Sequence, residues 1–260
     1  MLGGGYMNEF KVYEHDINEK QKIIIIDIQE ISIELEKEMD KYITEIWEGN
    51  TQGEIFDVKK QILKFLGEIE EDKKIGAIAE FFIHLYLKIN KYEQYCLFQN
   101  LEEDKSFKKG FDGLYALNNE NWLVESKSTE KIERRHHSKI LEAYNDLNKK
   151  VTGKESNNPW KNAYNHANNR DLNVPDDVRN AIRKLSSEYT NGIYTTLENY
   201  NIIPCSTKFF NKDKDKENIK TTTTEVENKI ESFEFKKIKA ICVNNKVADL
   251  FIQYLRKENE

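Results

Sequence analysis

The chain has 260 residues, enough to bury a full hydrophobic core. Charged residues make up 33% of it and the mean hydropathy is −0.78, yet an aromatic content of 11% is too high for a disordered chain. No run approaches the roughly 20 apolar residues of a membrane span, and residues 1–10 do not resemble a signal peptide. With three isolated cysteines that lack metal-site spacing, the composition predicts a cytoplasmic protein without membrane contact.

The net charge of −6 is unevenly distributed along the chain. Residues 1–80 carry 10 lysines and 19 acidic residues, a balance of −9, whereas residues 131–184 carry 12 basic and 7 acidic residues, a balance of +5. Such asymmetry favours a basic part that faces a polyanion and an acidic part that binds a basic protein surface. Helix faces whose charge simply fluctuates in sign are the alternative.

The first seventy residues predict strands followed by helices. A run of four isoleucines, residues 23–26, indicates a buried strand within an irregular strand region over 10–30. An amphipathic helix is expected over 31–47, and a second one after an N-cap at Asp57.

The next helix, expected over 72–90, is apolar around most of its circumference and should be the central buried helix. Glu80 and His84 break its apolar pattern and, four residues apart, share a face. Glu80 either forms a salt bridge at the edge of the helix or points into a polar site. His84 either hydrogen-bonds in that site or is a core histidine satisfied by a neighbour.

Residues 110–128, GFDGLYALNNENWLVESKS, predict a β-hairpin of two β-prone runs around a polar turn at residues 118–121. Asp112 stands at the head of the first run, while Glu125 and Lys127 stand at the end of the second. Alternation along the strand places Glu125 and Lys127 on one face and Ser126 on the other.

The remaining segments alternate between strands and helices, which together with the helices before the hairpin predicts a mixed α/β fold. We expect residues 1–70 to be a mainly helical part packed on a core of residues 71–260, in one continuous globular unit. The expected segments are a strand over 92–98, a charged loop over 99–110 with Lys105, Lys108 and Lys109, a basic helix over 130–150 with Ile132 on its inner face, a loop with a helical piece over 157–173, a helix from Pro175, strands over 201–210 and 235–243, an exposed low-complexity connection over 211–224, and a terminal helix over 247–256.

The hairpin carries the residue types of a divalent-metal site. Asp112 and Glu125 offer the carboxylate oxygens that Mg²⁺ prefers, and the Ser126 carbonyl offers another. Lys127 beside the ion would stabilise a phosphorane-like transition state or position the attacking water, and Glu80 would complete the site or hold a second ion. The alternative is a surface hairpin in which Glu125 and Lys127 form a weak ion pair.

A basic stretch directly after the hairpin is a candidate DNA contact, because lysine and arginine neutralise the phosphate backbone. The residues concerned are Lys131, Arg134, Arg135 and Lys139. The neighbouring His136 and His137 either touch phosphates or lie on a solvated helix face. Trp160, Tyr164 and His166 either stack on bases or pack in the core. No glycine motif that cradles phosphates is present, so we expect no ATP binding.

Asp112, followed 13 positions later by Glu125-Ser126-Lys127, resembles the motif of the PD-(D/E)xK nuclease superfamily. The upstream helical glutamate common in that superfamily matches Glu80, whereas Phe111 stands where the motif has proline. The resemblance implies a restriction-endonuclease-like core, with a mixed four-stranded sheet flanked by helices, and hydrolysis of DNA phosphodiesters that depends on Mg²⁺ or Mn²⁺.

A narrower resemblance concerns the layout of a GxxxE helix, a GFDG strand, a WLVESK strand and later strands that end in a terminal helix. This layout is similar to the nuclease subunit of Hachiman-type bacterial anti-phage systems. It implies an endonuclease effector of a defence or restriction system, restrained by a partner such as a superfamily-2 helicase. The alternative function is a non-catalytic interaction module whose acidic N-terminal part binds a protein.

Overall fold

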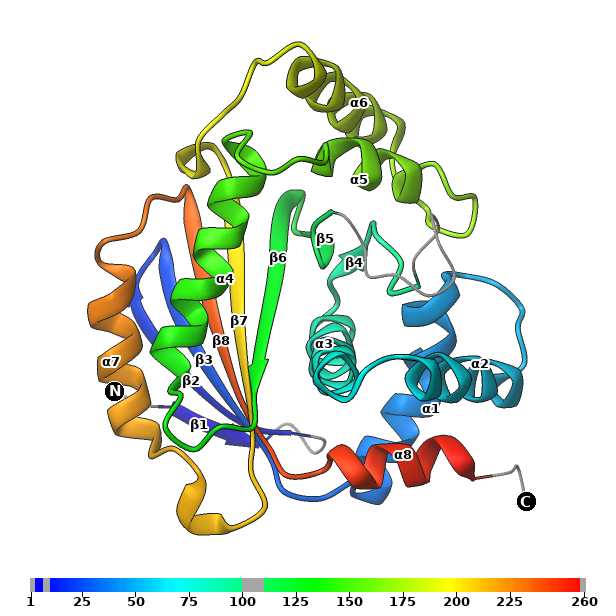
Figure 1. Cartoon of the computed structure of the whole chain (residues 1–260), viewed down its shortest axis with the longest axis vertical. Helices are drawn as coiled ribbons and strands as arrows, with labels where there is room; N and C mark the ends of the chain where they lie inside the picture. Colours follow the sequence, from blue (N-terminus) through cyan, green and yellow to red (C-terminus); the bar gives the residue numbers. More distant parts are fainter. Residues whose placement is uncertain (1–2, 7–9, 100–109, 258–260) are drawn as a thin grey trace.

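The computed structural model describes residues 3–6, 10–99 and 110–257, so the expected charged loop around Lys105, Lys108 and Lys109 lies almost entirely outside the described residues. The described residues form one mixed β-sheet with helices on both of its faces (Figure 1). The predicted α/β fold with a mixed central sheet flanked by helices is therefore confirmed.

The sheet has eight strands in the order β1-β2-β3-β8-β7-β6-β5-β4. Its centre is parallel, from β3 through β8 and β7 to β6, and antiparallel pairs extend it at both edges. It is wider than the four-stranded core that the resemblance implies. The strands are β1 (Gly3–Tyr6), β2 (Lys11–Asn18), β3 (Gln21–Ile28), β4 (Glu93–Gln94), β5 (Gly113–Leu117), β6 (Glu120–Thr129), β7 (Asn201–Phe209) and β8 (Lys237–Asn245).

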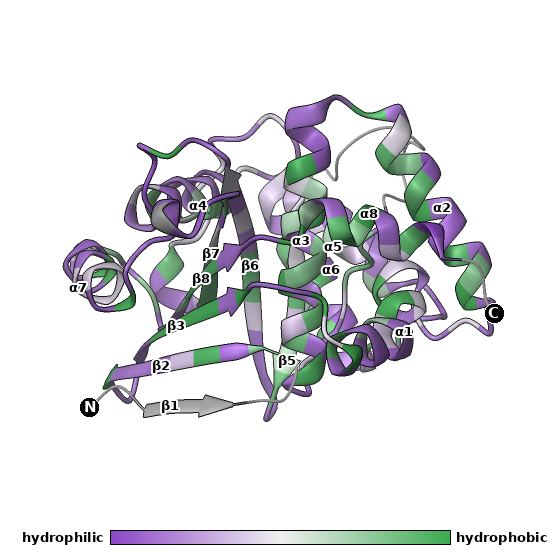
Figure 2. Cartoon of the chain, turned by 90° about the horizontal axis from the view of Figure 1, so that it is seen from below, coloured by the Kyte–Doolittle hydropathy of each residue, from purple (hydrophilic) through white to green (hydrophobic). Residues whose placement is uncertain are grey.

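Two groups of helices cover the two faces, as Figure 2 shows from a second direction. One face carries α1 (Ile33–Glu48), α2 (Ile55–Glu68), α3 (Glu71–Ile89) and α8 (Ala248–Arg256), and the other carries α4 (His136–Val151) and α7 (Ile219–Ile230). Helices α5 (Pro159–Ala167) and α6 (Asp176–Thr190) pack together above β5 in Figure 1, and their apolar residues join the same core as α4. None of the helices in the described part of the chain combines the length and apolar character needed to cross a membrane.

Each face of the sheet has its own hydrophobic core. Strand β3 shows the principle, because Ile24 and Ile26 belong to the core under α3, while Ile23 and Ile25 belong to the core under α4. The isoleucine run is thus a strand buried on both sides, as predicted. Helix α3 is also the central buried helix that its composition predicts. The suggested boundary at residue 70 lies between α2 and α3, and strands from both sides of it share the sheet.

The hairpin of β5 and β6 leaves part of β6 without an antiparallel neighbour. Its turn is shorter than expected, because Leu117 already pairs with Glu120. Asn118 and Asn119 form the two-residue turn between them, with positive φ angles of 52° and 62°. Strand β5 begins at Gly113, which pairs with Val124, whereas β6 continues to Thr129 along β7. Residues 125–129 therefore form an open edge on the side of β5.

Two predicted helix starts were wrong. The basic helix begins at His136, and Ile132, expected on its inner face, is 63% exposed in the turn before it. That turn is held by the Lys208 ammonium, which donates to the Ile132 carbonyl at 2.9 Å. Helix α2 begins at Ile55, so Asp57 lies in its first turn, where a carboxylate complements the helix dipole, and not at the N-cap.

Two further segments differ from the prediction. The expected strand over 92–98 is shorter, because β4 covers only Glu93–Gln94 and the Tyr95 amide makes one more bond to Leu114 of β5. The backbone then turns, and Phe98 donates to the Ile46 carbonyl at the end of α1. The connection over 211–224 is not exposed throughout, because α7 begins at Ile219 and buries Thr222 and Thr223. Cys96, Cys205 and Cys242 are all buried.

Candidate active site

Asp112 occupies the open edge of β6. The Ser126 amide donates to Asp112 Oδ2 at 2.7 Å, so the carboxylate takes the hydrogen bond that another β5 residue would have taken. The N–H and C=O of one strand residue project to the same side, as hydrogen-bonded pairs in antiparallel sheets require. The Ser126 carbonyl therefore faces the same side of β6 as Asp112.

Glu125 and Lys127 project from β6 toward α4, where they meet two side chains that the sequence did not single out. Glu125 Oε1 accepts from Lys127 at 3.0 Å, and Glu125 Oε2 accepts from Lys150 of α4. Lys127 also pairs with Asp146 of α4 at 2.9 Å. Asp146 and Lys150 lie one helical turn apart and so share a face. We refer to Glu125, Lys127, Asp146 and Lys150 as the charge cluster.

The charge cluster is not a weak surface ion pair, because Glu125 is only 2% exposed. Burial acts to lower the pKa of Lys127, but Glu125 and Asp112 together raise it well above its usual value. The same two carboxylates raise the pKa of Lys150 against the effect of its burial. Both lysines are therefore firmly cationic, and both lie close to Asp112 as well as to Glu125.

Negative charge is concentrated at Asp112. Burial, followed by the charges of Glu125 and Glu80, raises the pKa of Asp112 to about 7, although Lys150 and Lys127 act in the opposite direction. The ionised form of Asp112 is thus less stable than that of an aspartate in water, and a cation bound beside it would stabilise that form.

Glu80 approaches from the opposite helix layer. It lies on α3, where its Oε1 is 3.2 Å from Nε2 of His84. The other ring nitrogen of His84, which is buried, contacts the Tyr115 hydroxyl of β5. Since Glu80 raises the pKa of both Asp112 and Tyr115, its carboxylate lies near both. His84 is therefore a core histidine satisfied by a neighbour, and it also contacts Glu80 of the candidate site.

The donor set fits Mg²⁺ or Mn²⁺ bound partly by water. Among residues 3–6, 10–99 and 110–257, no three His, Cys, Asp or Glu side chains are arranged to hold a metal ion by themselves. Mg²⁺, however, usually takes one or two protein carboxylates and completes its shell with water and substrate phosphate. Asp112, Glu125 and the Ser126 carbonyl offer oxygens of this kind.

Basic residues line a cavity at the end of β6. This cavity, of about 290 Å³, lies between Ser128 and Thr129 of β6 and Asp72 of α3. Three of the four predicted DNA contacts line it: Lys131, Arg134 and Lys139. Arg135 does not; it pairs with Glu225 at 3.1 Å and with Glu217 at 3.6 Å.

The predictions for the histidine pair and for Trp160 have different outcomes. Neither alternative for His136 is correct, because it is fully buried, with Nδ1 2.8 Å from Ser206 Oγ and Nε2 3.2 Å from Asn244 Oδ1. His137 pairs with Glu225 at 3.0 Å. Trp160 is buried beside Phe111, with ring centroids 4.9 Å apart, so it packs in the core.

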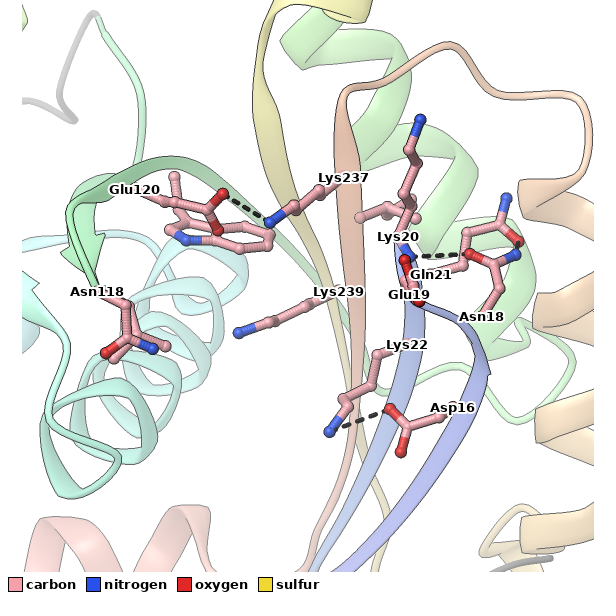
Figure 3. A pocket seen from close by; sticks show the side chains of 13 residues that line it. Asp16, Asn18, Glu19, Lys20, Gln21, Lys22, Asn118, Glu120, Lys237 and Lys239 are labelled. Atoms are coloured by element: carbon pink, nitrogen blue, oxygen red, sulfur yellow. Dashed lines mark hydrogen bonds and ion pairs between the residues drawn. The ribbon is translucent and has the colours of Figure 1, made fainter.

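A second pocket, of about 430 Å³, lies at the other end of the sheet (Figure 3). Its lysines come mainly from the starts of β3 and β8, but most of their charge is already compensated. Lys22 pairs with Asp16, and Lys237 donates to Glu120. Lys239 lies over the Trp122 ring, 4.5 Å from its centroid. The pocket contains none of the candidate catalytic residues.

Sequence reasoning missed Asp146 and Lys150. The available signal was their spacing of four on this helix, beside the apolar residues Ile140, Tyr144 and Leu147 that α4 buries. No protein family model matches the sequence, and no curated protein matches it either.

Proposed function

We propose that this chain is a Mg²⁺-dependent DNA endonuclease with a PD-(D/E)xK-type site on a restriction-endonuclease-like core. The observation that carries the proposal is the meeting of Asp112 with Glu125 and Lys127 where β6 extends beyond β5. A buried ExK pair beside an aspartate, at an open strand edge, is an unusual place for charge unless the charge has a chemical role.

Each residue has a distinct role in this proposal. Asp112, Glu125 and the Ser126 carbonyl would hold the ion, which would supply a water of lowered pKa and neutralise charge on the phosphate. Lys127 offers an ammonium fixed between Glu125 and Asp146, which suits stabilisation of the phosphorane-like transition state. Glu80 adds negative charge from the side of α3 and strengthens cation binding.

The cavity at the end of β6 supports DNA as the substrate. Its basic residues, Lys131, Arg134 and Lys139, follow the strand that carries the catalytic pair. A phosphate backbone bound there would place a neighbouring phosphodiester near the charge cluster, while contributing no sequence readout.

The acidic N-terminal part supports a protein partner. An unrestrained endonuclease would cut host DNA, so we propose that a partner such as a helicase subunit restrains it within an anti-phage defence or restriction system. Residues 1–80, with their balance of −9, are unsuited to DNA and suited to a basic protein surface.

The test is cleavage of supercoiled plasmid DNA by the purified full chain, alone and with its partner, in the presence of Mg²⁺ or Mn²⁺. Lys127→Ala should abolish cleavage, while the control Lys154→Ala, at an exposed position after α4, should retain it. Undiminished cleavage by a folded Lys127→Ala protein would refute the site. Biological activity that survives Asp112→Ala and Glu125→Ala would favour the non-catalytic interaction module.

A further inference from the structure

Both oxygens of the Glu125 carboxylate are occupied by lysine ammonium groups. Lys127 donates to Oε1 at 3.0 Å, and Lys150 donates to Oε2. A divalent ion held between Asp112 and Glu125 needs at least one of these oxygens. Metal and lysine therefore compete for the same carboxylate.

The two lysines are held to different degrees. Lys127 has a second carboxylate partner in Asp146, at 2.9 Å, which keeps its ammonium in place when Glu125 turns to another cation. For Lys150, Glu125 is the only carboxylate within ion-pair distance in the part of the chain that the structure describes. Lys150 is thus the group that a metal ion would displace.

Lys150 also has a favourable place to go. It lies in the last turn of α4, which ends at Val151, and a cation is stabilised there by the helix dipole. Its side chain is 14% exposed and consists of a flexible four-carbon stem, so the ammonium can reach water without movement of the helix.

We propose, building on the nuclease function proposed above, that Lys150 is a built-in counter-cation of Glu125 that a divalent ion must displace. Without metal, Lys150 shares with Lys127 the compensation of a carboxylate that is only 2% exposed. With metal, its release opens the second oxygen of Glu125. Lys150 therefore sets the metal concentration at which the site fills.

The first test measures Mn²⁺ binding to the full chain by isothermal titration calorimetry, without DNA. Lys150→Met removes the ammonium and keeps most of the apolar stem, so its Kd for Mn²⁺ should fall about tenfold, because the ion no longer has to displace a partly buried ion pair. Lys154→Met, the matched control, should bind Mn²⁺ as the wild type does. Equal or weaker binding by Lys150→Met would overturn the proposal.

The second test needs no variant, so it also applies should Lys150→Met fail to fold. Acetic anhydride labels accessible lysines, and mass spectrometry gives the rate at each position. Saturating Mg²⁺ should accelerate labelling of Lys150 several-fold, while Lys154 reacts at an unchanged rate. A labelling rate of Lys150 that does not respond to bound Mg²⁺ contradicts displacement.

A third variant separates this inference from the proposed function. Glu125→Gln should bind Mn²⁺ more weakly than the wild type if Glu125 is a ligand. If the wild type and Glu125→Gln bind Mn²⁺ equally well and neither cleaves DNA, the nuclease site itself is refuted. Binding that depends on Glu125, together with Mg²⁺-dependent cleavage but an unchanged affinity in Lys150→Met, would refute only the role of Lys150.

Discussion

Replacing Glu125 by glutamine should destabilise the protein as well as inactivate it. Glu125 is 2% exposed and is the shared partner of Lys127 and Lys150, whose side chains are 26% and 14% exposed. Removing one partner of a buried ion pair typically costs about 3–5 kcal/mol, because the other charge remains buried and uncompensated.

The loss in Glu125→Gln should be somewhat smaller than this, at about 2–4 kcal/mol. Lys127 keeps its ion pair with Asp146 at 2.9 Å, so most of the penalty falls on Lys150. Lys150 can in turn recover part of its hydration, since its long stem lies near the end of α4. The effect belongs to the metal-free protein and is independent of any catalytic role.

Urea unfolding followed by circular dichroism, without metal, measures this difference from the midpoint and slope. The double variant Glu125→Gln/Lys150→Met removes the stranded ammonium as well, so it should recover more than half of the lost stability. A Glu125→Gln protein within about 0.5 kcal/mol of the wild type would refute the reasoning. The reasoning would also be refuted if the double variant lost more unfolding free energy than the two single variants lose together.

Three further outcomes are expected. Lys131→Gln should weaken DNA binding and reduce the slope of log affinity against log salt by about 1, measured by fluorescence anisotropy; an unchanged slope would remove Lys131 from the interface. Gly110→Ala should cost about 1–3 kcal/mol in thermal unfolding, because its Cβ would collide with Asn162, whereas the control Gly67→Ala meets nothing and should not destabilise. The free energy of unfolding should fall as the pH drops below about 6.5, because His136 is buried in its neutral form.

Local patterns were sufficient where a residue's environment depends on its own strand or helix. The isoleucine run of β3, the apolar circumference of α3 and the hairpin of β5 and β6 followed from periodicity and turn composition. The same alternation predicted that Glu125 and Lys127 share a face. Alternation of side chains along one strand is a local property, so the sequence alone is sufficient to predict it.

Contacts between residues from distant segments of the chain could not be predicted in this way. Lys150 meets Glu125 across 25 residues, and His136 meets Asn244 across 108 residues. A histidine next to two arginines looks solvated, yet the parallel pairing of β7 with β8 leaves Ser206 and Asn244 buried under the start of α4. The sequence pattern shows a charged segment; only the tertiary arrangement decides which of its members turns inward.

The pH dependence follows from this buried position of His136. Asn244 Oδ1 lies 3.2 Å from Nε2 and can only accept, so in the neutral ring Nε2 carries the proton and Nδ1 is available to accept from the Ser206 hydroxyl. Burial lowers the pKa of His136, and the charges of Lys208 and Arg135 act in the same direction, while Glu217 and the Asn244 bond oppose them.

Acid should therefore loosen the start of α4, the helix that carries Asp146 and Lys150. Below about pH 6.5 the unfolded chain binds a proton that native His136 does not, so stability falls by up to about 1.4 kcal/mol per pH unit until the native pKa is reached. Urea midpoints at several pH values should show this slope reduced in His136→Gln but retained in His15→Gln, where His15 is a partly exposed histidine paired with Glu227. Equal slopes in both variants would mean that His136 does not titrate on unfolding, and the acid sensitivity of α4 would need another source.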